Sequence, residues 1–222
     1  MIKKNTSQKV LKILEEVDAM LLNDHLVLTS GKHSSAYIRK DKLYPHTTVT
    51  SDVCSLIAED MKDKNIDIVV GPALGGIVLS QWTAYHLTKK TGREVLSVFS
   101  EKHYDDKQIY DRPQMLKRGY DQLVKGKRVL IVEDLTATGA SVKKVVDKVK
   151  EAGGEVVCVY VLLNRNPEEV NSEFMGAPFE SLAVYEVEAY EPKNCPLCKK
   201  GVPINTEIGH GKEFLEKQKK KK

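Results

Sequence analysis

The stretch "RVLIVEDLTATGAS", Arg128–Ser141, carries the strongest structural signal in the chain. Its four consecutive apolar residues, Val129–Val132, predict a buried strand. Two acids, Glu133 and Asp134, follow directly. The small and hydroxyl-bearing residues after them are Thr136, Ala137, Thr138, Gly139, Ala140 and Ser141. A core strand that leads into two adjacent carboxylates and a small-residue turn suggests a ligand site at the strand's end.

The same alternation of strand and helix continues on both sides of this stretch. The predicted strands are "IDIVV" (66–70), "EVLSVFS" (94–100), "RVLIV" (128–132) and "EVVCVYVLL" (155–163), and the predicted helices lie within 76–89 and 139–152. Apolar strands that alternate with helices indicate a parallel sheet covered on both faces. We therefore expect an α/β protein with a central, mostly parallel sheet flanked by helices, and ligands beyond the carboxyl ends of its strands.

The N-terminal part has a different pattern. Apolar residues at helical spacing predict a helix over Ser7–Leu22 with Ser7 as its cap, and "LVLTSGKHSSAYIRK", Leu26–Lys40, predicts a hairpin or hood. A second helix is expected over 51–64. The predicted organisation is an N-terminal helix and hood (1–50), a core (51–190) and a C-terminal extension with a C-x-x-C pair and a basic tail (191–222).

Composition narrows the class of protein. The 222 residues are 30% charged with a net charge of +4, part of which lies in the terminal "KQKKKK". The near-neutral body gives no argument for nucleic-acid binding. The start, "MIKKNTSQKV", lacks the apolar segment of a signal peptide, and the apolar runs are too short to span a membrane. We expect a cytoplasmic protein with neither a membrane nor a nucleic-acid partner.

The turn after Asp134 suggests a specific ligand. The first amides of a helix that starts near Gly139, with the hydroxyls of Thr138 and Ser141, would bind a phosphate. Carboxylates beside a phosphate would repel it unless they bind sugar hydroxyls or magnesium, so the pattern favours a sugar phosphate. An ordinary strand-to-helix turn with exposed acids stays open as the alternative. The chain has no G-x-x-x-x-G-K-[ST], G-x-G-x-x-G or H-E-x-x-H motif.

These motifs resemble a known family. A hydrophobic strand, two acids and a small turn are similar to the 5-phosphoribosyl-1-pyrophosphate (PRPP) signature of the type I phosphoribosyltransferases, and "VVGPALGGI", Val69–Ile77, resembles their pyrophosphate loop. The hood stretch, "FSEKHYDD", "LKRGY" and "LLNR" are similar to the orotate-specific branch of that family. The resemblance spans Leu26–Arg165. It implies a type I phosphoribosyltransferase fold with a small N-terminal hood, and transfer of phosphoribosyl from PRPP to orotate in pyrimidine biosynthesis.

The resemblance also implies roles for individual residues. The residues that the resemblance implies to be catalytic are Lys102, Asp134 and Glu133. Its PRPP-binding residues are Ala73, Leu74, Gly75, Gly76, Lys102, Glu133, Asp134, Leu135, Thr136, Ala137, Thr138, Gly139, Ala140 and Ser141. Its orotate-binding residues are Ala137, Arg165, Ser30, Gly31 and Lys32. It further implies Mg²⁺ bound mainly through PRPP or pyrophosphate, no metal site made by the protein, and a homodimer in which Lys102 reaches the neighbouring subunit's site.

The chain departs from the family pattern at three positions. Ala137 stands where a threonine is common, and Gly75 and Thr29 stand where orotate enzymes have lysines. Lys32, Arg39, Lys117 and Arg118 are expected to compensate for the lost positive charge. Two alternative functions stay open: a phosphoribosyltransferase for a purine or another base, and a non-catalytic regulator with the same fold.

Two further segments stand out. The polar segment Glu101–Lys125 is predicted to be a mobile lid, because it is long and lacks a clear period. Cys54 and Cys158 are expected to pack in the core. Cys195 and Cys198 form half of a zinc motif with His210 nearby in sequence; a thiol turn, or a site completed across a dimer, are equally open.

Overall fold

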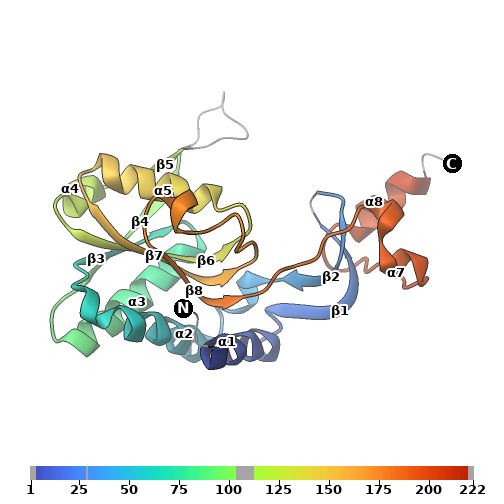
Figure 1. The fold of residues 1–222 in the computed structure, drawn as a ribbon, viewed down its shortest axis with the longest axis horizontal. Coiled ribbons are helices and arrows are strands. Elements are labelled where there is room, and N and C mark those ends of the chain that lie inside the picture. The colour runs from blue at the N-terminus through green and yellow to red at the C-terminus, as the bar shows by residue number, and fades with distance from the viewer. Residues whose placement is uncertain (1–3, 29, 104–112, 220–222) are drawn as a thin grey trace.

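The structure is a computed structural model that describes residues 4–28, 30–103 and 113–219 (Figure 1). Its centre is a six-stranded sheet with the order β5-β4-β3-β6-β7-β8. The strands are β3 (Ile68–Pro72), β4 (Leu96–Lys102), β5 (Gln114–Met115), β6 (Arg128–Thr136), β7 (Glu155–Asn164) and β8 (Phe179–Val184). All neighbours pair in parallel except β4 and β5. The predicted mostly parallel sheet is confirmed.

Helices cover both faces of this sheet, as Figure 1 shows. One face carries α1 (Lys4–Glu16), α2 (Thr47–Met61) and α3 (Gly75–Thr91), and the other carries α4 (Tyr120–Val124), α5 (Ala140–Glu151) and α6 (Ser172–Met175). Side chains of a strand point alternately to its two faces. Leu130 and Val132 of β6 therefore belong to the first core, and Val129 and Ile131 to the second. Burial on both faces explains the continuous apolar run.

Strand β6 is longer than its apolar run. It continues through Glu133 and Asp134 to Thr136, with Glu133 opposite Val161 of β7. The prediction that the strand ends at Val132 was wrong, because hydrophobicity marks burial among apolar neighbours and not the extent of backbone pairing. The acids consequently sit inside the sheet, and their backbone is held in place on the β7 side.

The N-terminal helix is shorter than predicted and Ser7 does not cap it. Helix α1 already includes Lys4 and ends at Glu16, and Met20–Val27 forms strand β1. Leu21, which fits the helical period, instead pairs with Tyr37 across an antiparallel hairpin with β2 (His33–Ile38). Short apolar runs fit either period, and pairing with β2 decides between them.

The C-terminal extension returns to this hairpin. Tyr190 and His33 exchange two backbone hydrogen bonds of 2.8 Å, and the Asn205 amide donates to the His25 carbonyl at 2.8 Å. Figure 1 shows α7 and α8 beside the hairpin and away from the central sheet. The remaining elements are α7 (Pro196–Lys199), α8 (Gly211–Lys219) and the 3₁₀ turns η1 (Lys40–Lys42), η2 (Lys62–Lys64) and η3 (Pro192–Asn194).

Several short elements were not predicted. The lid prediction over 101–125 falls partly on 104–112, outside the described residues, and the rest of that segment contains the end of β4, β5 and α4. Elements α6 and β8 also lacked a sequence signal. Two-residue strands and four-residue helices are too short to show a period. No helix in the described part of the chain is long and apolar enough to cross a membrane.

Candidate active site

The loop between β3 and α3 passes close to β6 because three glycines permit it. A Cβ on Gly71 would lie 1.9 Å from the Gly76 carbonyl oxygen, so the strand end and the helix start touch through backbone atoms. A Cβ on Gly75 would lie 2.1 Å from Asp134 Oδ2 and 2.2 Å from the Tyr44 hydroxyl. No side chain fits at Gly75 with these neighbours in place, which accounts for the absence of a lysine there.

Asp134 is the centre of the site. Its side chain is 3% exposed, and it accepts a hydrogen bond from the Tyr44 hydroxyl. Lys40 Nζ lies 3.2 Å from Asp134 Oδ1. Burial acts against the charged form of Lys40, but Asp134 and then Glu133 outweigh it and raise its pKa. Burial, followed by the charge of Asp134, also raises the pKa of the Tyr44 phenol, so Tyr44 stays a donor.

Glu133 has a different environment from its neighbour. It is 8% exposed, and its carboxylate accepts a hydrogen bond of 2.9 Å from the Asp134 amide. Burial, reinforced by the charge of Asp134, raises the pKa of Glu133 to about 8. A raised pKa makes the protonated form of Glu133 more accessible than that of an exposed glutamate, and in that form the carboxyl group can donate a hydrogen bond to a ligand.

A cavity of about 710 Å³ is lined by Lys40 and Tyr44, the two side chains that contact Asp134, although neither acid itself lines it. Ala73, Leu74 and Gly75 form one side of it. The Ala73 amide donates to the Ser100 carbonyl at 2.8 Å, so this amide already has an acceptor within the protein. The first amides of α3, by contrast, have no acceptor within the helix. The other lining residues are Lys40, Asp41, Tyr44, Val78, Glu101, Lys102 and Lys117.

Two predicted basic residues line this cavity. Lys102 stands at the end of β4, where it faces the β3–α3 loop of its own chain, and Lys117 stands beyond β5. Arg118, expected to compensate for missing lysines, instead forms a two-pronged ion pair with Glu101, at 3.1 and 3.2 Å. The cavity thus has three ammonium groups, from Lys40, Lys102 and Lys117, to bind an anion.

The predicted phosphate loop lies beside the acids. Ala137, Thr138, Ala140 and Ser141 are exposed at the start of α5, where free helix amides meet solvent. Gly139 has φ of +69°, and a Cβ there would lie 2.8 Å from the Phe174 ring. Leu135 is half-buried, and Thr136 is buried, with its hydroxyl 3.2 Å from Asn164 Oδ1. The exposed residues of this loop are therefore Ala137, Thr138, Ala140 and Ser141.

A second, smaller cavity of about 350 Å³ adjoins the end of β7. Ala137 and Arg165 line it, as the orotate prediction requires of them, together with Asn166, Glu168, Glu186, Val187 and Glu188. Burial lowers the pKa of Arg165, and its Nε has no hydrogen-bond partner among the described residues. A half-buried guanidinium whose buried Nε has no partner among the described residues suits a carboxylate ligand.

The predicted hood residues do not join these cavities. Ser30, Gly31 and Lys32 line neither of them, and Lys32 Nζ lies 3.6 Å from a Glu191 carboxylate oxygen. Arg39 also lines neither cavity. Thr29 lies outside the described residues. The structure brings Lys102, Glu133, Asp134 and the two loops together, and leaves the hood turn apart from them.

Lys40 and Tyr44 were missed from the sequence. They follow the hairpin, some ninety residues before Asp134, and no local motif marks them. The available signal was the group of basic residues near the hood. It led us to predict roles for Lys32 and Arg39 but not for Lys40, the residue after Arg39. Tertiary folding alone shows which of these neighbouring cations reaches the acids.

Comparison with known proteins gives a consistent result. The phosphoribosyl transferase domain family matches residues 40–176. The orotate phosphoribosyltransferase of Caldanaerobacter subterraneus subsp. tengcongensis is 36% identical over 197 residues, which is 89% of this chain and 94% of that protein. The one from Caldicellulosiruptor bescii is 38% identical over 184 residues, 83% of this chain and 88% of that protein.

A solved structure has the same fold. The crystal structure of Mycobacterium tuberculosis orotate phosphoribosyltransferase in complex with PRPP matches with a TM-score of 0.59 and 21% identity, over 81% of this chain and 96% of that one.

Proposed function

The chain belongs to the phosphoribosyl transferase domain family and, within it, to the orotate phosphoribosyltransferases, and from this premise we propose that it transfers the 5-phosphoribosyl group of PRPP to a ring nitrogen of orotate. The products are orotidine 5-phosphate and pyrophosphate. One observation carries the proposal: Asp134, in a buried pair with Glu133, contacts Lys40 and Tyr44 in the wall of the larger cavity, and the same strand leads into the exposed start of α5.

PRPP would span these features. The ribose hydroxyls would bind the two acids, since Asp134 accepts hydrogen bonds and protonated Glu133 can donate one. The 5-phosphate would bind the amides at the start of α5 with the hydroxyls of Thr138 and Ser141. The pyrophosphate would lie in the larger cavity, against the start of α3 and the ammonium groups of Lys40, Lys102 and Lys117.

The chemistry is a substitution at ribose C1. As pyrophosphate leaves, negative charge grows on it and C1 becomes positive. Lys102 and Lys117, which line the larger cavity, would stabilise that negative charge, and such electrostatic stabilisation is usually the largest catalytic contribution. The orotate nitrogen then bonds to C1. No covalent enzyme intermediate is needed.

Arg165 would bind the orotate carboxylate. Its free Nε and its position beside Ala137 support this, since both line the smaller cavity. Three glutamates in the same wall disfavour an anion, so the guanidinium has to supply the compensating charge. Without Arg165, this cavity would repel orotate.

Mg²⁺ is proposed as the cofactor, bound mainly through PRPP. Magnesium prefers oxygen ligands and keeps several that are not protein. Among the described residues no group of three carboxylates converges, and the carboxylates at the site are Glu133 and Asp134, with Asp41 and Glu101 in the cavity wall. When bound, the ion would neutralise charge on pyrophosphate. We further propose a cytoplasmic homodimer, in keeping with the shared sites of this family.

Base preference tests the proposal. Purified protein with PRPP and Mg²⁺ is offered orotate, uracil, hypoxanthine, guanine and adenine, and pyrophosphate release is followed. We expect release with orotate, and much less with uracil, which lacks the carboxylate that Arg165 binds. Turnover of a purine without orotate would support the purine alternative, and PRPP binding without any turnover would support a regulator.

A further inference from the structure

Four metal-binding side chains meet where the C-terminal extension returns to the hairpin. His25 of β1 and His33 of β2 face Cys195 and Cys198, and the four candidate ligand atoms all lie within 4.8 Å of one another. The sequence pattern showed only the cysteine pair and the nearby His210, which is not in this group. The histidines come from positions about 170 residues earlier in the chain.

We propose that these four residues bind one structural zinc ion per chain. Zinc bonds of about 2.0–2.1 Å to nitrogen and 2.3 Å to sulfur predict, at a tetrahedral centre, about 3.4 Å between two nitrogens and about 3.5 Å between nitrogen and sulfur. His25 Nε2 lies 2.9 Å from His33 Nδ1 and 3.6 Å from each of the two sulfurs. Cys198 Sγ lies 3.3 Å from His33 Nδ1. These four of the six edges are close to, or slightly shorter than, those of a tetrahedral zinc site, and the other two are no longer than 4.8 Å.

Hydrogen bonding alone does not explain the cluster. His25 Nδ1 lies 2.7 Å from the Val202 carbonyl, which can only accept, so Nδ1 carries the proton and Nε2 has one lone pair. Three groups approach that single lone pair: His33 Nδ1, Cys195 Sγ and Cys198 Sγ. A cation at the centre resolves this conflict, because each ligand then directs its lone pair to the metal.

The surroundings fit a structural zinc. The Val202 carbonyl fixes the His25 tautomer, as outer partners of metal-bound histidines generally do. His25, His33 and Cys195 are buried, whereas Cys198 is exposed and gives the ion a way in. Four protein ligands leave no open position for substrate, and Cys₂His₂ sets of this kind are structural.

The ion would join the hood to the C-terminal extension. Other contacts also link the two parts, among them the Tyr190–His33 bridge, the Asn205–His25 hydrogen bond and the His33–Phe214 ring contact, and the ion would add to them. His33 follows directly on the predicted orotate-binding turn Ser30–Lys32. The site is not part of the proposed catalytic mechanism, and its test does not depend on turnover of any base.

Metal content is the direct measurement. The full-length protein, purified with reduced thiols and supplied with Zn²⁺, is expected to retain one zinc per chain by elemental analysis. Co²⁺ in its place is expected to give the intense visible bands of a tetrahedral site and thiolate-to-metal charge transfer. Cys198→Ser, at an exposed ligand, should weaken zinc binding by more than about a hundredfold. Cys158→Ala, which removes a core thiol outside the cluster, is the matched control and should retain the zinc.

Chelation tests the structural role. Removing zinc from the wild type should lower the melting temperature and speed tryptic cleavage within 193–219, while Cys198→Ser should show fast cleavage with or without chelator. Equal zinc content in wild type and Cys198→Ser, tetrahedral cobalt bands that survive in that variant, or a Cys195–Cys198 disulfide under these reducing conditions would overturn the proposal.

Discussion

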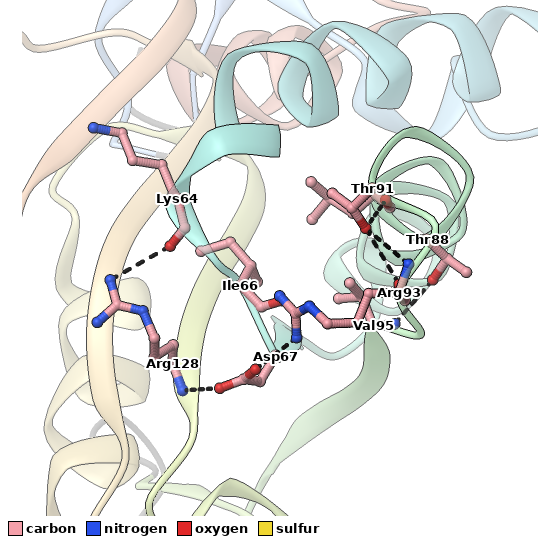
Figure 2. A network of polar contacts seen from close by, with 9 residues as sticks. Lys64, Ile66, Asp67, Thr88, Thr91, Arg93, Val95 and Arg128 are labelled. Atoms are coloured by element: carbon pink, nitrogen blue, oxygen red, sulfur yellow. Dashed lines mark hydrogen bonds and ion pairs between the residues drawn. The ribbon is translucent and has the colours of Figure 1, made fainter.

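At the amino ends of β3, β4 and β6, a single carboxylate is fully matched by protein donors (Figure 2). Asp67 Oδ1 accepts from Arg93 at 2.7 Å, and Oδ2 accepts from the Arg128 amide at 2.9 Å. Arg93 also donates to the Ile66 carbonyl at 2.7 Å. The Arg128 amide, and then Arg93, outweigh partial burial and hold the pKa of Asp67 below its usual range.

At the carboxyl ends of the same strands, the charges are not matched in this way. Glu133 and Asp134 are adjacent and buried, and burial with mutual repulsion raises the pKa of Glu133 to about 8. Three lysines, of which Lys40 is paired with Asp134, line a cavity at this edge. At the amino edge the charged groups are therefore paired within the protein. At the carboxyl edge we expect a ligand to supply the missing partners. Substitutions should affect stability at the first edge and function at the second.

The largest expected effect is on ligand binding at the carboxyl edge. Asp134→Asn removes the charge that organises Tyr44 and Lys40, and should lower kcat/KM for PRPP by about a hundredfold or more. Steady-state kinetics with varied PRPP would measure it. Asp67→Asn, the same change at the other edge, should leave kcat/KM within about threefold of wild type. An equal loss of kcat/KM in Asp134→Asn and Asp67→Asn would contradict the proposed difference between the two edges of the sheet.

A smaller catalytic effect is expected at Lys102. Lys102→Ala should lower kcat by about ten- to a hundredfold with little change in PRPP affinity, because charge on pyrophosphate grows mainly in the transition state. Turnover assays and calorimetric PRPP titration separate the two quantities. Lys125→Ala, an exposed lysine just before β6, is the control and should change neither. A loss of PRPP affinity equal to the loss of kcat would assign Lys102 to ground-state binding instead.

At the amino edge we expect a stability effect. Asp67→Ala leaves the Arg128 amide and Arg93 without their acceptor, and should cost about 1–3 kcal/mol of unfolding free energy. Urea denaturation would measure it. Since the native pKa of Asp67 is depressed, its contribution is present above about pH 4 and is lost as pH falls through the lower native value. Wild type and variant should therefore converge in stability at low pH.

The last effect concerns pH at the carboxyl edge. Because the pKa of Glu133 is raised to about 8 in the folded protein, the native state binds more protons than the unfolded chain between about pH 4.5 and 8. This group should lower stability by up to about 1.4 kcal/mol per pH unit as pH rises through that window. Glu133→Gln should flatten that slope. Parallel slopes for both proteins, in urea melts at pH 5, 6, 7 and 8, would refute the assignment.

Much of the fold was predictable because it rests on local patterns. The run Val129–Val132 predicted a strand buried on both faces, and its residues alternate between the two cores. The order of strands and helices predicted the parallel sheet. Prediction failed where the pattern was ambiguous or short: Leu21 fits a helix and a strand equally, and β5 and α6 are too short to show a period.

The candidate site was predictable to the extent that it lies within contiguous motifs. Glu133, Asp134 and the glycines of the β3–α3 loop are close to each other because parallel strands end at one edge of the sheet. Lys40 and Tyr44 lie in no such motif, since no local sequence pattern near residue 40 predicts a contact with residue 134. Arg118, which was expected to compensate for the missing lysines, is paired with Glu101, a neighbour only in space.

The sequence by itself determined which residues form strands and which loops lie at their carboxyl ends, since hydrophobic periodicity and small-residue turns act over a few neighbouring positions. Only the tertiary structure decided the partners of those residues. It brought Lys40 and Tyr44 to Asp134, left the Ser30–Lys32 turn outside both cavities, and joined Cys195 and Cys198 to His25 and His33. Electrostatic and metal-ligand contacts depend on the distance between residues in space, and the number of residues between them along the sequence does not give that distance.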